Sequence, residues 1–361
     1  MKPLGVAELR LLRKLVIDPS VTQAELAREL GVTRSAVNQI WQKLRRERQL
    51  SVCGSLDYGQ LGMRLAFGWA KDKEGSETLQ KFSRWLKSSP LTMAVMRSVM
   101  SSMMDSRVYF EAVLPQSQMG MWFLNQLERF KKKPYNLSFT FGVASHVANH
   151  MNLGLFDGRD WEVIDGFRFG ATIDSAKGYA DVLPDVQTSE QSQPIVASPD
   201  SILVASLIEQ DYYATSRQLE KAYNTLGKQA PSERTLRRRL AALRRRGTVP
   251  YVSIENIGLS QRIVISLEEP PDDSSLSRLL QVQATTFPKA RVVHDINLTS
   301  MVLDLPESAS WFAISQVLSE SASVTSKMCT FIAENIQIRR GLESLTHSLV
   351  QDIGEEIDSR H

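Results

Sequence analysis

The sequence predicts an α+β fold made of two tandem copies of one unit, each a helical segment followed by strands alternating with helices. The first observation is a repeat. The segment LRRERQLSVCGSLDYGQLGMRLAF, which starts at Leu44, returns as LRRRGTVPYVSIENIGLSQRIVI, which starts at Leu243. Apolar residues at helical spacing precede each segment, and short apolar runs bounded by turn residues follow it. A repeat of this length organises the whole fold, so two similar halves are expected.

Composition indicates a globular protein without membrane segments. The chain has 361 residues, of which 42% are hydrophobic and 23% charged, as is usual for globular domains. No run approaches the roughly 18 consecutive apolar residues of a membrane helix. The charged N-terminus is unlike a signal peptide. Cys53 and Cys329 are too distant in sequence to form a disulfide framework, so we expect a cytoplasmic protein with no membrane partner.

Positive charge is concentrated in two predicted helices. The net charge is only +3, but residues 34–48 carry five cations against one glutamate, and residues 232–246 carry seven arginines against one glutamate. The rest of the chain is therefore acidic. Such segregation is typical of a protein that binds an anionic polymer, although a single charged run is more often a solvated helix face.

The first copy opens with a predicted helix-turn-helix. Leucines at helical spacing indicate a first helix that ends before Pro19, because proline disfavours helix in the preceding residue. Thr22 is expected to cap a helix over residues 23–30, and Gly31 ends it because glycine readily takes the left-handed conformation. A third helix covers residues 34–48. The shared core is expected to contain Leu26, Leu30, Val32, Val37 and Ile40.

The helix over residues 34–48 is a candidate recognition helix for the DNA major groove. Its outer face is polar, and asparagine and glutamine can bond bidentately to an adenine edge. The N-terminal residues of such a helix usually reach the bases, whereas cations at the far end contact phosphates. The base-reading candidates are Arg34, Ser35, Asn38, Gln39 and Gln42. The phosphate candidates are Arg45, Arg46 and Arg48.

The second copy has the same plan with a longer turn, at residues 228–231, before the helix over residues 232–246. Its outer positions hold arginine where the first copy has asparagine and glutamine. Guanidinium groups on three sides suit phosphate clamping, or guanine contact, more than adenine reading. The candidate phosphate anchors are Arg234, Arg237, Arg238 and Arg245. The first half is therefore expected to read the DNA bases and the second half to bind the phosphates.

After each basic helix the sequence predicts a hairpin segment and then strand, helix, strand, strand, helix, strand. The hairpin segments, which would act as wings, are 50–56 and 249–254. The predicted strands are 64–70, 91–98, 107–114, 137–143, 262–267, 290–297, 300–305 and 326–333. The predicted helices are 77–87, 118–130, 274–285 and 309–319. This order is the ferredoxin-like βαββαβ plan, with both helices on one face of an antiparallel sheet. The other face is expected to pair with a second sheet, within the chain or in a homo-oligomer.

Two segments lie outside the repeated plan. Residues 144–182 are expected to contain a helix, on which His146 and His150 would share a face. The apolar residues that indicate this helix are Trp161, Ile164 and Phe167. No further ligand completes a metal site at a suitable spacing, so neither a metal nor another cofactor is expected. At the C-terminus, apolar residues over 338–353 predict an amphipathic helix.

These segments resemble the Lrp/AsnC (feast/famine) family of transcription regulators. The residues that carry the resemblance are TQAELARELGVTRSAVNQIWQKLRRERQL, at 22–50, and LDYGQLG, at 56–62. The family joins a winged helix-turn-helix to a ferredoxin-like regulatory domain, binds palindromic DNA as homodimers or larger assemblies, and in part responds to amino acids. Its effector pocket often lies near a glycine-containing turn. The corresponding turns, at 101–107 and 297–300, lack glycine, so no effector residue is assigned.

The resemblance implies a tandem pair of family subunits. The expected domains are a winged helix-turn-helix at 1–60, a regulatory domain at 61–183, a linker at 184–199, a second winged helix-turn-helix at 200–258 and a second regulatory domain with the C-terminal helix at 259–361. The expected function is sequence-specific binding of double-stranded DNA in transcription regulation, without enzyme activity. Two alternatives stay open: a regulator that binds protein instead of DNA, and a tetrapyrrole decarboxylase of the same fold family.

Overall fold

The computed structural model describes residues 2–72, 76–99, 106–162, 198–245, 248–268, 280–281, 284–307, 327–334 and 338–346. The chain forms two compact units. The first unit holds Met1–Cys53, Val147–Val186 and Pro250–Thr330, and the second holds Gly54–His146, Gln187–Val249 and Phe331–His361. Each unit therefore combines the helices that open one sequence copy with strands of the other copy. The linker at 184–199 and the helices at 274–285 and 309–319 lie largely outside the described residues, and the domain boundaries stay predictions.

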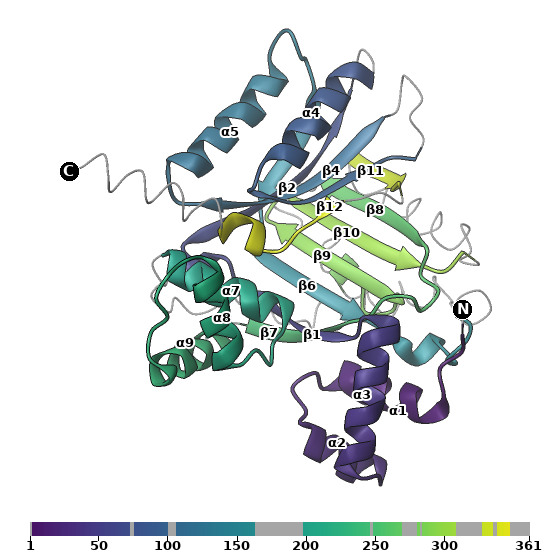
Figure 1. The fold of residues 1–361 in the computed structure, drawn as a ribbon. Helices are drawn as coiled ribbons and strands as arrows, with labels where there is room; N and C mark the ends of the chain where they lie inside the picture. The colour runs from purple at the N-terminus through teal and green to yellow at the C-terminus, as the bar shows by residue number, and fades with distance from the viewer. Residues whose placement is uncertain are drawn as a thin grey trace. The chain divides into compact units, whose positions relative to one another are not determined.

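The first unit begins with the predicted helix-turn-helix. Its helices are α1 (Val6–Ile17), α2 (Gln23–Leu30) and α3 (Arg34–Arg48) (Figure 1). The Thr22 hydroxyl accepts a hydrogen bond from the Glu25 backbone N at 3.3 Å, and the Glu25 carboxylate accepts one from the Thr22 backbone N at 2.9 Å. Gly31 ends α2 with φ of 67°, and Thr33 caps α3 by accepting a hydrogen bond from Ala36 N at 3.2 Å. The predicted helix bounds and caps are confirmed.

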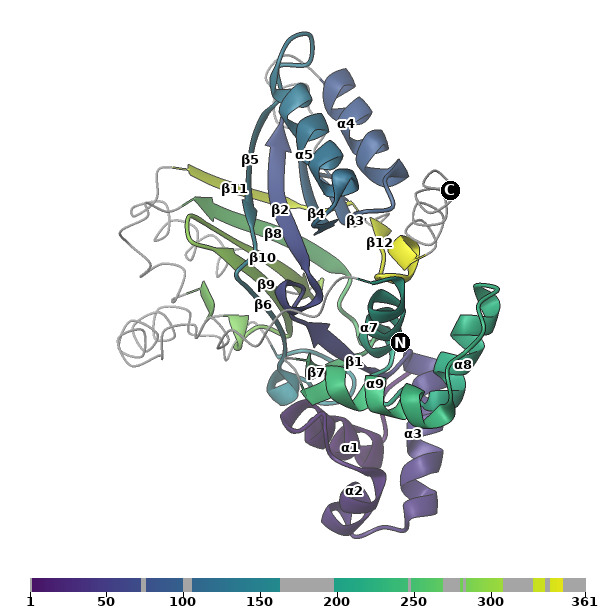
Figure 2. The same ribbon diagram turned by 90° about the vertical axis from the view of Figure 1, so that its left-hand side faces the viewer.

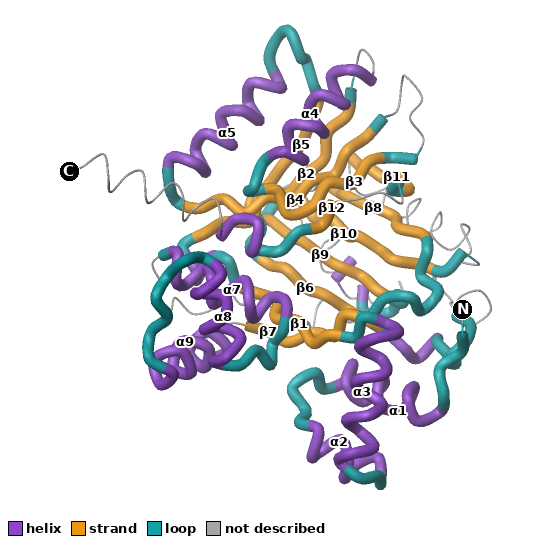
Figure 3. Tube along the Cα trace, viewed as in Figure 1, coloured by secondary structure: helices purple, strands orange, loops and turns teal. Residues whose placement is uncertain are grey.

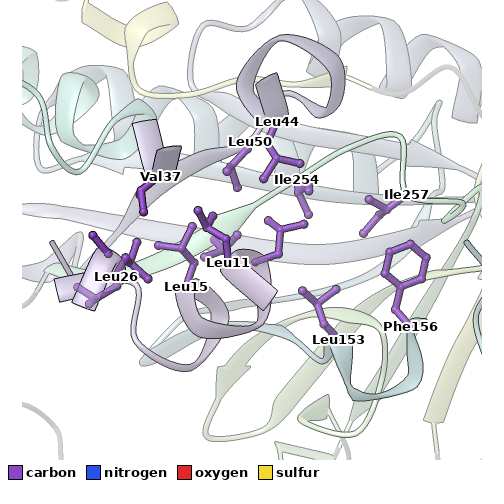
Figure 4. Close-up of a cluster of buried hydrophobic side chains, with 14 of the residues drawn as sticks. Leu11, Leu15, Leu26, Val37, Leu44, Leu50, Leu153, Phe156, Ile254 and Ile257 are labelled. Carbon is purple, nitrogen blue, oxygen red and sulfur yellow. The ribbon is translucent and has the colours of Figure 1, made fainter. Parts of the chain in front are cut away.

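One cluster of buried side chains holds α1, α2 and α3 together, and it includes two distant segments (Figure 4). The helices and the residues just after them contribute Leu11, Leu12, Leu15, Val21, Leu26, Ala27, Val37, Leu44 and Leu50. The distant members are Leu153, Phe156, Trp161, Val252, Ile254 and Ile257. Val32, predicted in this core, is instead 40% exposed because it lies in the turn between α2 and α3. The helix-turn-helix therefore needs later parts of the chain to complete its core.

The first unit also contains a five-stranded sheet with the order β11-β8-β10-β9-β6. Its strands are β6 (His146–Met151), β8 (Gln261–Glu268), β9 (Lys289–Asp295), β10 (Leu298–Leu305) and β11 (Lys327–Ile332). In the central strand Met301 lies opposite Ile265 and Val292. These three side chains pack with Leu280 and Phe287 in a second buried cluster on one face of the sheet.

The second unit contains the corresponding sheet, with the order β12-β3-β4-β2-β5. Its strands are β2 (Met63–Lys71), β3 (Thr92–Arg97), β4 (Arg107–Pro115), β5 (Ser138–Val143) and β12 (Ile338–Arg339), and its helices are α4 (Ser76–Ser88) and α5 (Gln118–Lys131). Both helices cover the same face (Figure 2). The buried ring of Phe82 on α4 lies 5.8 Å from Phe110 on β4 and 5.1 Å from Phe130 on α5. The ferredoxin-like strand and helix plan predicted for this half is confirmed.

The two repeats exchange edge strands. β6 follows β5 in the chain but pairs with β9 of the second repeat, and β12 follows β11 but pairs with β3 of the first repeat. In the β12 pairing Ile338 lies opposite Val95 and Arg339 opposite Ala94. Arg340 extends the contact, because its backbone N donates to Met93 O at 2.7 Å and its guanidinium to Lys87 O at 2.8 Å.

At the described residues, these extra segments differ from the predictions in three places. His146 and His150 lie on strand β6, not on a helix. Trp161 forms a β-bridge with Phe156, whereas Ile164 and Phe167 of the predicted helix lie outside the described residues. Ile338 belongs to β12, so the predicted C-terminal helix does not start there. Residues 343–346 are helical, and residues 347–353 lie outside the described residues. In each case the residues have helical spacing, but pairing at a sheet edge or packing in the core determines their structure.

The predicted wings pair with each other. β1 (Ser51–Leu56) and β7 (Thr248–Ser253) form a two-stranded sheet. The expectation that each segment forms a hairpin within its own copy is therefore wrong. Gly54 on β1 is required by close packing, since a Cβ there would lie 2.8 Å from Ile208 Cγ2 and 2.9 Å from Ile208 O. The second unit also contains α7 (Pro199–Gln210), α8 (Ser216–Thr225) and α9 (Glu233–Arg245). Among the described residues, no helix has the length and apolar character needed to cross a bilayer.

We expect Phe156→Ala to destabilise the protein by about 3–5 kcal/mol, the usual effect of removing a buried aromatic ring. The ring is fully buried and stacks on Trp161 with their centroids 4.7 Å apart. Denaturant unfolding measures the change. Ile17→Ala, at a position that is 80% exposed, is the control and should stay within about 0.5 kcal/mol of the wild type. Equal effects of the two substitutions would show that residues 153–161 are not part of this core.

Candidate nucleic-acid interface

The outer face of α3 presents the polar residues selected from the sequence. Short loops join α3 to α2 and α2 to α1 (Figure 3). Val37 and Leu44 are buried in the cluster on the inner face. Seven of the predicted contact residues are exposed, as is Glu47; the seven are Arg34, Ser35, Asn38, Gln39, Gln42, Arg45 and Arg46. All seven therefore lie on the surface of one helix, where a macromolecular partner can reach them.

Two other cations of α3 point inward. The Lys43 ammonium forms an ion pair with Glu8 Oε1 on α1, and the Glu8 Oε2 accepts a hydrogen bond from Gly5 N at 2.8 Å. Arg48 is only 6% exposed, and its guanidinium donates to the backbone oxygens of Lys2 and Asn256. The expectation that Arg48 contacts phosphate is therefore wrong. Sequence reasoning missed these partners because nothing local marks a contact across 35 or 208 residues.

The pKa of Glu8 is set by opposing effects. Burial alone would raise it, but the hydrogen bonds from Lys43 and Gly5 and the positive charges of Lys43 and Arg48 outweigh burial and hold the pKa below the usual 4.5. A carboxylate with a lowered pKa stabilises the folded state at pH values above its unfolded pKa, and this stabilisation is lost as pH falls through the folded pKa. The α1–α3 contact is thus a charged contact at neutral pH.

Helices α7, α8 and α9 repeat parts of the same construction. Thr215 caps α8 by accepting a hydrogen bond from Gln218 N at 3.3 Å, and Gly227 follows with φ of 68°. Ser232 Oγ accepts a weak hydrogen bond from Thr235 N at 3.4 Å at the start of α9. The buried face of α9 is formed by Leu236, Leu240 and Leu243.

The arginines of α9 divide into an exposed set and an internal set. Arg234, Arg237, Arg238 and Arg245 are exposed, and Arg237 pairs with Glu233 one turn earlier, at 2.6 Å. Arg239 instead binds Asp200 Oδ2 at 2.7 Å and the Tyr223 hydroxyl. Arg244 donates to Tyr212 O at 2.7 Å and to Ala214 O. The internal arginines fasten α9 to α7 and to the turn before α8.

The Tyr223 hydroxyl is held in its neutral form. Burial, together with the negative charge of Asp200, raises the pKa of Tyr223 to about 12. The hydroxyl therefore stays protonated at neutral pH, beside the Arg239–Asp200 pair. This site serves packing of the three helices. Among the described residues no group of three His, Cys, Asp or Glu side chains is arranged to hold a metal ion.

The winged helix-turn-helix DNA-binding family matches residues 9–48. This match covers most of α1 and all of α2 and α3, so the N-terminal helices carry a DNA-binding type of helix-turn-helix. A comparison with curated protein sequences finds no match.

The solved structures that match this chain include enzymes and regulators. The siroheme decarboxylase NirDL is 14% identical, with 96% of this chain and 99% of that chain covered and a TM-score of 0.48. An AsnC family transcriptional regulator from Agrobacterium tumefaciens is 20% identical, with 38% of this chain and 90% of that chain covered and a TM-score of 0.27. LrpC of B. subtilis is 18% identical, with 40% and 94% covered and a TM-score of 0.27.

We expect Lys43→Met to raise the pKa of Glu8, because burial then acts without its main opposing partner. The carboxyl titration can be followed by NMR in wild type and variant, with 4.5 as the reference for an unperturbed glutamate. Lys14→Met is the control, because it removes an exposed ion pair between Lys14 on α1 and Glu29 on α2. It should leave the Glu8 titration unchanged. A Glu8 pKa that is unchanged in Lys43→Met would contradict the assigned cause.

Proposed function

We propose that the chain is a sequence-specific DNA-binding transcription regulator that reads base edges through α3. The observation that carries the proposal is the exposed polar face of α3 within the segment that the winged helix-turn-helix DNA-binding family matches. Thr33 caps the helix, and the polar residues Asn38 and Gln39 follow within its first two turns. In the major groove, this end of a recognition helix usually meets the bases.

The side chains on this face suit mixed base and phosphate contacts. Asn38, Gln39 and Gln42 can each donate and accept through one amide, which matches the N6 and N7 atoms of adenine. Arg34 can bond guanine O6 and N7, or a phosphate. Arg45 and Arg46 lie in the last turn of α3, where phosphate contacts that fix the register are expected. Internal pairing of Lys43 and Arg48 leaves this face with a sparse set of cations.

We further propose that α7, α8 and α9 act as a second helix-turn-helix that holds DNA mainly by its phosphates. The exposed residues of α9 that support this are Arg234, Arg237, Arg238 and Arg245. Guanidinium groups bond bidentately to phosphate and bring a salt-dependent, sequence-independent affinity. The chain would then use one helix for reading and the other for anchoring. An effector and a homo-oligomer formed through the sheets stay predictions.

Selection of bound sequences from a random pool of double-stranded DNA tests the proposal. Recovery of a common motif, bound with a steep dependence on salt concentration, is the expected result. Recovery of no motif, together with binding that does not change with salt, would contradict it. That outcome would favour the alternative in which the winged helices bind another protein.

Two substitutions separate reading from anchoring. We expect Gln39→Ala to lose discrimination at one base pair, at a cost of about 1–3 kcal/mol. We expect Arg238→Ala to weaken binding to all sequences alike and to lower the slope of log K against log salt by about one. Fluorescence anisotropy at several salt concentrations, on the selected site and on single-mismatch sites, measures both. If both variants bound like the wild type, α3 and α9 would not be the contact helices.

We also propose that the chain acts by binding and is not an enzyme. Incubation of the protein with siroheme under anaerobic, reducing conditions tests the decarboxylase alternative directly. Each decarboxylation replaces a carboxyl group by hydrogen and releases CO2, which mass spectrometry of the tetrapyrrole detects. Product that accumulates in proportion to enzyme and time would overturn this proposal and leave the DNA-binding test to be judged separately.

A further inference from the structure

The last residue of α3, Arg48, fastens the recognition helix to a segment far away in the chain. Its guanidinium donates to the backbone oxygens of Lys2 and Asn256. Its own carbonyl accepts a hydrogen bond from Glu255 N at 2.8 Å. Side chain and backbone of one residue are thus bonded to two consecutive residues that follow β7. All these groups lie in the first unit.

The segment that receives Arg48 is itself fixed to the sheet of the first unit. Glu255 Oε1 lies 3.0 Å from Lys289 Nζ, at the start of β9, and that ammonium lies 3.4 Å from Asp304 Oδ2 on β10. On the other side, Trp161 Nε1 donates to Ile257 O at 2.6 Å. Ile257 is buried in the same cluster as the helices. The end of α3 is therefore bonded to a segment that the sheet and the buried cluster hold in place.

We propose that Arg48 is a positioning residue that sets the angle at which α3 presents its base-reading end, an inference that rests on the proposed function. The base-reading residues Arg34 and Asn38 lie at the opposite end of the helix. The rise of an α-helix places Arg34 roughly 20 Å from Arg48. A tilt of about 10° at the anchored end would move Arg34 by roughly 3–4 Å, which is more than the tolerance of a hydrogen bond.

The bonds from the Arg48 guanidinium to the carbonyls of Lys2 and Asn256, called the clamp below, need an arginine. The planar guanidinium presents several donors in a fixed fork, so one group reaches the carbonyls of Lys2 and Asn256 together. A lysine ammonium keeps the charge but has a single compact head on a flexible stem. A phosphate contact, by contrast, tolerates either cation. Charge-conserving substitutions therefore distinguish a clamp from a phosphate contact.

The test compares Arg48→Lys with Arg10→Lys, a control at an exposed arginine of α1 that is not among the proposed contact residues. We expect Arg48→Lys to reduce the preference for the selected site over single-mismatch sites by about tenfold, the discrimination that one or two base contacts supply. The salt slope for non-specific DNA should be unchanged, because no phosphate contact is lost. Arg10→Lys should keep both quantities. Affinities are expressed per active molecule, from stoichiometric titration of each preparation.

Two results on DNA would overturn the inference. If Arg48→Lys kept the full preference for the selected site, Arg48 would not position α3, even if the variant had a lower melting temperature. Arg48 would then only stabilise the fold. Loss of a phosphate contact lowers the salt slope by about one, as we expect for Arg46→Gln. The same decrease in Arg48→Gln would show that Arg48 contacts a phosphate. Trp161→Phe provides a milder second variant, since it keeps the packing but removes the bond to Ile257 O. It should reduce the preference in the same direction.

Amide hydrogen exchange tests the clamp without DNA. The Glu255 amide should exchange about tenfold faster in Arg48→Lys than in the wild type, while amides inside α2 keep their rates. An unchanged Glu255 rate would overturn the inference. If the wild-type protein selected no DNA motif, the proposed function would fail, and this exchange experiment alone would decide whether Arg48 fixes the end of α3.

Discussion

The exchange of two short edge strands is the constraint on which the rest of the structure depends. A sheet edge exposes unpaired N–H and C=O groups that must be covered or paired. β6 covers the edge of β9, and β12 covers the edge of β3. Each repeat therefore uses the strand that follows the other repeat's sheet, and neither repeat has a complete sheet by itself. After β6 the chain continues at once into Leu153 and Phe156, which enter the core of the N-terminal helices.

Sequence reasoning succeeded where the physical cause is local. Thr22, Gly31 and Thr33 predict helix ends because capping and left-handed backbone involve residues three or four apart. The strands β2, β3, β4 and β5 follow from apolar runs bounded by turns, and they order themselves as the ferredoxin-like plan requires. The repeat added the expectation that the second half would follow the same order, and its described strands do.

The same reasoning failed where a distant partner decides. His146 and His150 have helical spacing, yet the open edge of β9 makes them part of a strand. In the sequence, nothing distinguishes Arg48 from the other arginines at the end of this helix. Its partner, the Asn256 backbone oxygen, is recognised only in the structure. The predicted wings, β1 and β7, have the composition of strands, but composition does not tell which strand they pair with. Charge along a helix therefore overstates the charge available to a partner, since part of it is used inside the fold.

The buried cluster of the N-terminal helices also has a consequence for synthesis. A ribosome releases α1, α2 and α3 early, but Val252, Ile254 and Ile257 complete their core only much later. At about 5–20 residues per second, the delay between the two is roughly 10–40 seconds. Throughout that interval the side of the cluster that Val252, Ile254 and Ile257 cover lacks its partners. The first helices to be synthesised are thus among the last elements whose core can be completed.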